Sequence, residues 1–340
     1  MSRQRRGAGR VTLATVAALA EVSAMTVSRY FNEPARVSEV HRERIAAAIA
    51  ATGYVPNQVA GGLASSKNRI VGLVVPNISG PIFASTIQAF HDTLGAQGYQ
   101  VLMASSYFSA QQEENAVRAF LGWAPAALVV TSHFHTPATE RMLASASVPV
   151  LEVWDYQPQR QPIQVGFDHT EVGRMAVEHL HGRGYRRIAF VANSATGDHS
   201  ALERRDGYVQ ALARHGLAPI LYQPDAALPP FEAGKQALEA LMAQATRPDA
   251  IFFANDNLAA GGLLAAQRAG VRIPGDCAVL GFGDYPFAQM LMPSLSTLRP
   301  PAREIGEQAA AYLLASFNAV PDRPAPPAAL HCTLVQREST

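Results

Sequence analysis

The chain has 340 residues, a hydrophobic fraction of 48% and a formal net charge of +1, values typical of a globular protein with two or three domains. No apolar stretch approaches the ~18 residues needed to span a bilayer, and the basic, polar N-terminus lacks the apolar core of a signal peptide. The two cysteines, Cys277 and Cys332, are too few for a disulfide framework or a cysteine zinc site. We therefore expect a cytoplasmic protein with no membrane partner.

Charge is unevenly distributed along the chain. Residues 1–69 carry ten of the 28 basic residues and four of the 27 acidic ones, which leaves 18 basic and 23 acidic residues for the remainder. A small basic segment ahead of a mildly acidic body is typical of a nucleic-acid reader. A solubilising charge run at the terminus is the other interpretation, and charge alone does not separate the two.

The first 56 residues predict three helices, and a hydroxyl residue suited to N-capping precedes each of them. The expected helices are 13–20 after Thr12, 24–32 after Ser23, and 41–52 after Ser38, with Gly53 as a left-handed stop. The first two are too short to be stable alone, so we expect them to pack on each other and on the third. Small Ala17 and Ala20 would allow the close crossing of a helix-turn-helix.

Residues 54–69 predict a linker. Pro56 ends the element before it, and Gly61 and Gly62 make any helix in this segment marginal. We expect the segment to order on binding.

From Ile70 onward, apolar runs such as IVGLVVP, AALVVTS and DAIFFAND alternate with amphipathic segments such as PIFASTIQAFHDTLGAQ. Near-continuous apolar strands joined by helical crossovers indicate parallel sheets covered on both faces. At least nine strands over about 260 residues exceed what one doubly wound sheet usually holds. We therefore predict an α/β core of two such units. The chain after Ser296 should supply a strand, a helix and a last strand that return to each unit in turn.

The sequence lacks common enzyme signatures: it has no G-x-G-x-x-G after a strand, no G-x-x-x-x-G-K-[ST] and no G-x-S-x-G. His133 and His135 can share one face of a strand, but a metal site needs further ligands and none is evident nearby. A loop role or a polar contact near a cleft is the favoured interpretation of the pair. We expect no enzyme activity, no metal and no cofactor.

The stretches TLATVAALAEVSAMTVSRYFN and VSEVHRERIAAAIAATGYVPNQVAGGLAS resemble the DNA-binding head and hinge of the lactose-repressor family. The similarity continues through VGLVVPN, VGFDHTEVG, RRDGY, FFANDNLAAGGL and VRIPGDCAVLGFGD, so it covers the chain from Val11 to the last strand. Within the family, the chain looks most similar to the gluconate-utilisation repressors. That similarity is carried by TVSRYFNEPARVS, IAAAIAATGYVPN, HTPATERML, VPVLEVWD and VGFDHTEVGRMAV.

This resemblance implies an N-terminal all-α helix-turn-helix head, a hinge helix, and an α/β core of two doubly wound parallel-sheet subdomains similar to periplasmic binding proteins. The implied segments are the head at 1–56, the hinge at 57–68, one core subdomain at 69–168 and 298–324, and the other at 169–297 and 325–340. The implied function is transcriptional repression. The implied partners are double-stranded operator DNA, further copies of the chain in a dimer or tetramer, and a small sugar acid, gluconate or a keto-gluconate.

The resemblance also assigns DNA contacts to the head and the hinge. The matching positions are Thr12, Ser23, Ala24, Met25, Thr26, Ser28, Arg29, Asn32 and Tyr54 in the head and Asn57, Leu63 and Ala64 in the hinge. Arg29 can pair bidentately with guanine, and Leu63 matches a minor-groove wedge. Solvation of the helix is the alternative for the hydroxyl residues. The family usually has glycine where this chain has Glu21, and a non-glycine residue in a left-handed turn costs on the order of 1 kcal/mol.

The implied effector site lies in the cleft at the carboxyl ends of the strands. Its candidate residues are Phe83, Thr131, Glu152, Asp155, Asp168, Arg204, Asn255, Asp256 and Asp284. Arg204 can hold a carboxylate with two parallel hydrogen bonds. For each candidate carboxylate, a helix cap or a solvated loop is the alternative. Tyr285 and Phe231 either close the pocket or belong to the core. Many members have an acid where this chain has Gly283, a departure compatible with an acidic ligand.

Two other functions compete with this interpretation. A sugar-binding protein for transport shares the implied fold, and fold alone does not decide function. The basic head and the missing signal peptide argue against it, and such a protein would lose nothing essential without residues 1–56. A nucleotide-cofactor enzyme would need a phosphate-binding loop, which the sequence lacks.

Overall fold

The computed structural model describes residues 11–56, 68–78, 80–160, 162–193, 195, 197–318 and 325–340. The chain forms two compact units, Met1–Asn68 and Arg69–Thr340. The predicted hinge contacts Asn57, Leu63 and Ala64 lie outside the described residues. Within the described ranges, no helix is both long enough and apolar enough to cross a membrane.

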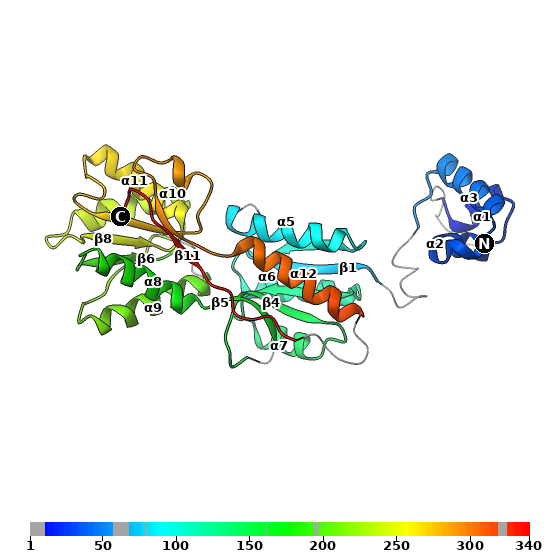
Figure 1. The fold of residues 1–340 in the computed structure, drawn as a ribbon, viewed down its shortest axis with the longest axis horizontal. Coiled ribbons are helices and arrows are strands. Elements are labelled where there is room, and N and C mark those ends of the chain that lie inside the picture. Colours follow the sequence, from blue (N-terminus) through cyan, green and yellow to red (C-terminus); the bar gives the residue numbers. More distant parts are fainter. Residues whose placement is uncertain are drawn as a thin grey trace, which may run out of the picture. The chain divides into compact units, whose positions relative to one another are not determined.

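Short helices form the first unit (Figure 1). They are α1 (Leu13–Leu19), α2 (Ala24–Asn32), the 3-10 helix η1 (Pro34–Arg36) and α3 (Glu39–Thr52). A small shared core buries Val16, Ala17, Val27, Ile45 and Ala48. Because α1 contacts both α2 and α3, tertiary packing stabilises helices that are too short to persist alone. The predicted helix-turn-helix is confirmed.

The helix ends follow the expected capping pattern with one exception. Thr12 accepts a hydrogen bond from the Thr15 amide, Ser23 accepts one from the Thr26 amide at 3.1 Å, and Gly53 ends α3 with φ +63°. Ser38 occupies the N-cap position of α3, but its side chain makes no capping hydrogen bond, so the prediction of a side-chain cap there was wrong. Glu21 adopts φ 55°, the left-handed turn in which glycine is usual.

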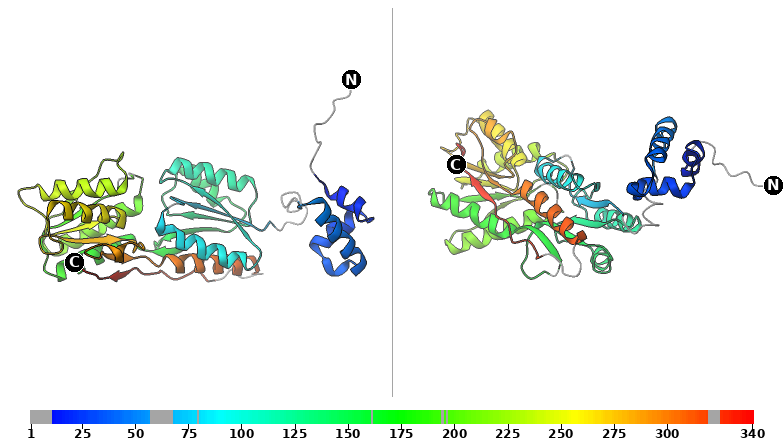
Figure 2. Two further views of the ribbon diagram at one scale, coloured as in Figure 1. Left: turned by 90° about the horizontal axis from the view of Figure 1, so that it is seen from above. Right: turned by 45° about the vertical axis from the view of Figure 1, so that its right-hand side comes forward.

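The first sheet of the larger unit is parallel, in the order β2-β1-β3-β4-β5. Its strands are β1 (Ile70–Val75), β2 (Gln100–Ser105), β3 (Ala127–Thr131), β4 (Val150–Asp155) and β5 (Ile163–Phe167). The helices beside it are α5 (Pro81–Gly95), α6 (Ala110–Gly122), α7 (Pro137–Ala144) and α12 (Ala302–Asn318). Figure 2 shows α5 and α12 on one side of this sheet and α6 on the other.

The second sheet has the order β11-β10-β9-β8-β6-β7, and only β11 is antiparallel to its neighbour. Its strands are β6 (Ile188–Val191), β7 (Ile220–Tyr222), β8 (Ala250–Phe253), β9 (Ala278–Phe282), β10 (Ser296–Arg299) and β11 (Thr333–Val335). The remaining helices are α8 (His169–Gly182), α9 (His199–Arg214), α10 (Pro230–Met242), α11 (Asp256–Ala269) and the 3-10 helix η2 (Ala288–Met290). The helices pack as the pairs α8–α9 and α10–α11.

The chain passes between the two sheets more than once. After β10 it returns to the first sheet as α12, which lies against α5 (Figure 1). The C-terminal stretch then runs back along both sheets: the Leu330 amide donates to the carbonyl of Gly166 at 2.8 Å, and β11 pairs with β10. The predicted fold class, two doubly wound α/β units, is confirmed.

Close helix packing holds α8 and α9 at a fixed separation. A Cβ atom on Gly207 would lie 1.9 Å from the Thr170 carbonyl oxygen, and one on Gly173 would lie 1.9 Å from that of Arg204. Glycine is therefore required at both contacts. This contact fixes Arg204 of α9 relative to His169 at the start of α8.

Candidate functional site

Helix α2 presents an exposed face that combines polar and apolar side chains. Val27 is fully buried in the head core, whereas Ala24, Met25, Arg29 and Asn32 are exposed. Thr12 and Ser23 are also exposed, and Thr26, Ser28 and Tyr54 are half-buried. This arrangement places the predicted base-reading positions together on one accessible surface, as a helix that enters the major groove requires.

Arg29 differs from the other arginines of the described head. Within residues 11–56, Arg36 pairs with Glu33 at 2.9 Å, Arg42 pairs with Glu39, and Arg44 pairs with Glu21 at 3.4 Å. In this range of the chain Arg29 forms no ion pair. Its five donors are therefore available to a base edge or a phosphate.

Several of the polar groups predicted to contact DNA already have protein partners. Ser23 Oγ caps the helix and lies 2.9 Å from Thr26 Oγ1. Asn32 Nδ2 donates to the Ser28 carbonyl at 3.0 Å. These bonds leave lone pairs and protons available, so contacts to DNA phosphates remain a prediction. The charge of Glu21 is partly offset by Arg44, with which it pairs.

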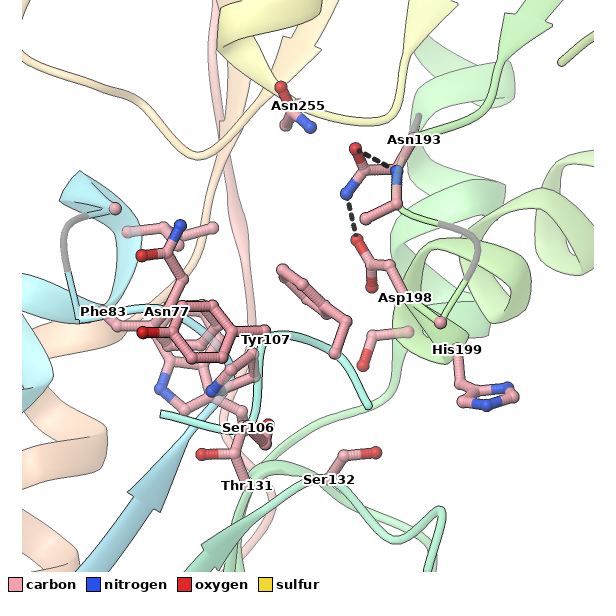
Figure 3. Close-up of a pocket in the computed structure, with 18 of the residues that line it drawn as sticks. Asn77, Phe83, Ser106, Tyr107, Thr131, Ser132, Asn193, Asp198, His199 and Asn255 are labelled. Carbon is pink, nitrogen blue, oxygen red and sulfur yellow. Dashed lines mark hydrogen bonds between the residues drawn. The ribbon is translucent and has the colours of Figure 1, made fainter. Parts of the chain in front are cut away.

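A cavity of about 390 Å³ lies between the two sheets. Its walls come from residues that follow strands β1, β2, β3, β6, β8 and β9, which is the edge where ligands bind in α/β sheets. In Figure 3, Asn77, Phe83, Ser106, Tyr107, Thr131 and Ser132 lie across the cavity from Asn193, Asp198 and Asn255. The lining thus combines aromatic surface with amide, hydroxyl and carboxylate groups, as a polyol site needs.

Four of the nine predicted effector contacts line this cavity: Phe83, Thr131, Arg204 and Asn255. The other five, Glu152, Asp155, Asp168, Asp256 and Asp284, are absent from the lining. Tyr285 is buried and lines the cavity, whereas Phe231 is 43% exposed and does not.

All five outlying carboxylates have partners within the protein; Asp155, for example, accepts from the His133 amide at 3.2 Å. Glu152 lies within β4 and pairs with Arg160 at 2.6 Å, and Asp168 caps α8 by accepting from the Thr170 amide at 2.7 Å. Asp256 accepts from Thr297 Oγ1 at 2.7 Å, and Asp284 pairs with Arg299 at 2.6 Å and with Arg337 at 2.7 Å. The structure therefore shows the helix-cap alternative at Asp168.

Arg204 is held rigidly at the cavity wall. Its Nη1 donates to His169 Nδ1 at 2.9 Å, its Nη2 donates to the Ala254 carbonyl at 3.2 Å, and its guanidinium carbon lies 4.2 Å from the centre of the Phe282 ring. Burial lowers the pKa of His169 to about 4, so the imidazole is neutral and Nδ1 can accept. Among the described residues, Arg204 Nε has no hydrogen-bond partner. The side chain is thus oriented yet keeps donor capacity.

Asp155 connects this arginine to a second polar cluster. Its Oδ1 lies 3.3 Å from His169 Nε2, and its Oδ2 lies 3.0 Å from His133 Nδ1. The side-chain amide of Gln157 lies 2.9 Å from both His133 Nε2 and Glu203 Oε1. Burial, followed by the charge of Asp155, raises the pKa of Glu203 to about 7.

His133, Asp155 and Glu203 place ligand atoms within 4.8 Å of one another, a spacing that a cation can use. The Gln157 amide, however, already links His133 and Glu203 by hydrogen bonds, so these side chains have partners within the protein. His133 stood out in the sequence, whereas Glu203 did not, because α9 brings that carboxylate from 70 positions further along the chain.

Glu113 of α6 is a cavity residue that the sequence did not reveal. It is 6% exposed, lines the cavity, and accepts from His135 Nδ1 at 2.6 Å. Burial acts to lower the pKa of His135, but Glu113 and Glu152 raise it to about 9. The pair is therefore an ion pair at neutral pH. The His-x-His spacing was visible in the sequence, but nothing near it identified its acidic partner.

Models of two protein families match the chain. The lacI family of bacterial regulatory proteins matches residues 12–57, and a periplasmic binding protein-like domain matches residues 177–340. The HTH-type transcriptional regulator GntR of Pseudomonas aeruginosa is 35% identical over 315 residues, which are 91% of this chain and 90% of that protein. GntR of Escherichia coli K12 is 31% identical over 309 residues, which are 91% and 92% of the two chains.

Solved structures give the same result. A LacI family transcriptional regulator from Silicibacter pomeroyi has a TM-score of 0.90 at 27% identity and covers 97% of this chain and 99% of its own. The lac repressor dimer bound to operator and the anti-inducer ONPF has a TM-score of 0.82 at 27% identity, with coverage of 97% and 99%. With these similarities over both units, the chain belongs to the lacI family of bacterial regulatory proteins and is a DNA-binding transcriptional regulator.

Proposed function

We propose that the protein is a cytoplasmic, non-enzymatic repressor whose affinity for operator DNA is controlled by a small sugar acid, with gluconate or a keto-gluconate as the effector. One observation carries the effector proposal: a buried arginine, whose Nε has no hydrogen-bond partner among the described residues, lines a cavity that combines apolar surface with amide and hydroxyl groups. A guanidinium in this position favours a carboxylate ligand because two parallel hydrogen bonds match the two oxygens. The resemblance to gluconate-utilisation repressors supports the same ligand class.

The remaining lining suits the hydroxylated part of such a ligand. Asn77, Asn193 and Asn255 offer amides, Ser106 and Thr131 offer hydroxyls, and these polar groups come from both sides of the cleft (Figure 3). Phe83 and Trp154, whose rings lie 4.9 Å apart, give an apolar surface for the carbon chain. A ligand that satisfies groups on both walls would stabilise a closed cleft.

We propose that this closure is the allosteric step. The two core subdomains, 69–168 with 298–324 and 169–297 with 325–340, would rotate about the segments that cross between the sheets. In a homodimer, this rotation changes the spacing of two heads and therefore the operator affinity. Effector and operator then act on one shared equilibrium, so each must change the affinity for the other by the same factor.

Titration calorimetry with gluconate tests the effector proposal. Wild-type protein should bind, and Arg204→Ala should lose binding while still binding DNA, because Arg204 belongs to the core and not to the head. Arg205→Ala is a matched control, since Arg205 is the adjacent arginine and pairs with Asp206 instead of lining the cavity. Retained gluconate binding by Arg204→Ala would show that the anchor is another residue.

A further inference from the structure

Charged side chains line the cavity on both of its walls. Arg204, on α9, is the one Arg or Lys among the described residues that line it, and Glu113, on α6, lines it from the other sheet. Asp198 is the other lining carboxylate and lies on the same wall as Arg204, whose Nη2 is 3.9 Å from Asp198 Oδ2. The Asp198 oxygens also accept from the Ala201 amide at 3.0 Å and from Asn193 Nδ2 at 2.8 Å. Both oxygens of Asp198 thus have protein partners, whereas Glu113 is the lining acid with an oxygen left for a ligand.

The local contacts keep Glu113 an acceptor. Its Oε1 is bound by His135, while Oε2 accepts no hydrogen bond from the residues that the structure describes. An ionised carboxylate accepts hydrogen bonds and donates none, so this oxygen suits a hydroxyl group of a ligand. His135 is fully buried behind Glu113 and cannot itself reach a ligand.

Among the residues that the structure describes, the cationic side chains ion-paired around Glu113 already have carboxylate partners. The other side of His135 faces Glu152 Oε1 at 3.5 Å, and the guanidinium of Arg160 is shared between Glu152 and Glu140. Within the described residues, this chain of ion pairs contains three carboxylates (Glu113, Glu152 and Glu140) and two cationic side chains (His135 and Arg160). A ligand carboxylate placed here would meet like charge in a desolvated site, which is strongly disfavoured.

We propose that the cleft selects sugar acids with a single carboxylate, held at Arg204, and that Glu113 reads the hydroxyl at the far end and rejects a second carboxylate. This inference rests on the proposed sugar-acid effector and specifies its class further: aldonates are accepted and aldarates are excluded. Discrimination of this kind works by penalising the wrong ligand, because its added charge has no partner in the site.

D-Gluconate and D-glucarate are a matched pair for the test. They share six carbons and the same configuration at the inner hydroxyls, and they differ in a terminal hydroxymethyl or carboxylate group. Calorimetry at pH 7.5 would compare both ligands on wild type, Glu113→Gln and Glu114→Gln. Glu114 is the control because it is next in sequence but pairs with Thr136 and Arg118, away from the cavity.

The wild type should bind gluconate roughly tenfold or more tightly than glucarate, and Glu113→Gln should reduce that ratio mainly by gaining affinity for glucarate. Glu114→Gln should keep the wild-type ratio. Equal binding of the two acids by the wild type overturns the inference without needing any variant, and so does an unchanged ratio in a Glu113→Gln protein with native circular dichroism. Failure of the wild type to bind either acid overturns the sugar-acid proposal itself, and this inference with it.

Discussion

Replacing Arg29 by alanine is expected to weaken operator binding by ~1–3 kcal/mol, the range for one bidentate arginine–guanine contact. That free energy corresponds to roughly a fivefold to 150-fold increase in Kd. The structure indicates that the loss will be one of DNA contact alone. Arg29 is exposed on α2 and, within residues 11–56, is the arginine without an ion pair. Its truncation should leave the stability of the head unchanged.

Fluorescence anisotropy at fixed salt measures this effect on the operator and on a set of operators with one base pair changed in each. Arg29→Ala should flatten the preference at one base position. Arg36→Ala is the matched control, since its side chain is 76% exposed and paired with Glu33, and it should cost little. A uniform loss on every sequence, with a smaller salt dependence, would identify Arg29 as a phosphate contact and refute its base-reading role.

Further perturbations test the hinge, the helix packing and the buried ion pair. Leu63→Ala should weaken specific binding more than non-specific binding if Leu63 is a minor-groove wedge; equal losses in anisotropy would make it a plain linker residue. Gly207→Ala should lower the free energy of unfolding by about 2 kcal/mol, because its Cβ would meet the Thr170 carbonyl at 1.9 Å. Gly182→Ala is the control and should leave the free energy of unfolding unchanged, because its Cβ would meet no atom within 4 Å. Similar denaturant midpoints for the Gly207→Ala and Gly182→Ala proteins would refute the packing argument. The pKa of His135 is raised from 6.5 to about 9 in the folded protein. Its ion pair should therefore contribute its full stabilisation of the fold below the unfolded pKa, and this contribution should be lost as pH rises through 9. The difference in the free energy of unfolding between wild type and His135→Gln should therefore shrink as pH rises from 6.5 to about 9. A difference that stays constant over this pH range would exclude the ion pair.

Local patterns predicted the head well because its determinants are local. Caps at Thr12 and Ser23 and the stop at Gly53 each depend on residues within one turn, and all three are present. Ser38 shows the limit of such reasoning, because the right residue at the right position makes no side-chain hydrogen bond.

The cleft was predicted less completely because its chemistry is non-local. Position at or after a strand end identified Phe83, Thr131 and Asn255, and the family resemblance identified Arg204; all four line the cavity. It could not show that other strand-end acids have protein partners far along the chain, as Asp284 has in Arg337. Nor could it find Glu113, whose connection to His135 requires α6 and the loop after β3 to meet in space. Predictions of cavity-lining residues were therefore correct where the backbone alone places the residue at the cavity. They were wrong where a partner distant in the sequence binds the side chain.

The most direct test of the account is anisotropy of the purified protein on the DNA upstream of its own gene, titrated with and without gluconate at one salt concentration. We predict tight, sequence-specific binding whose Kd rises when gluconate is added, because release is the expected direction. Tight binding that gluconate leaves unchanged would contradict the proposed effector. Absence of specific binding under either condition would contradict the operator-binding function itself.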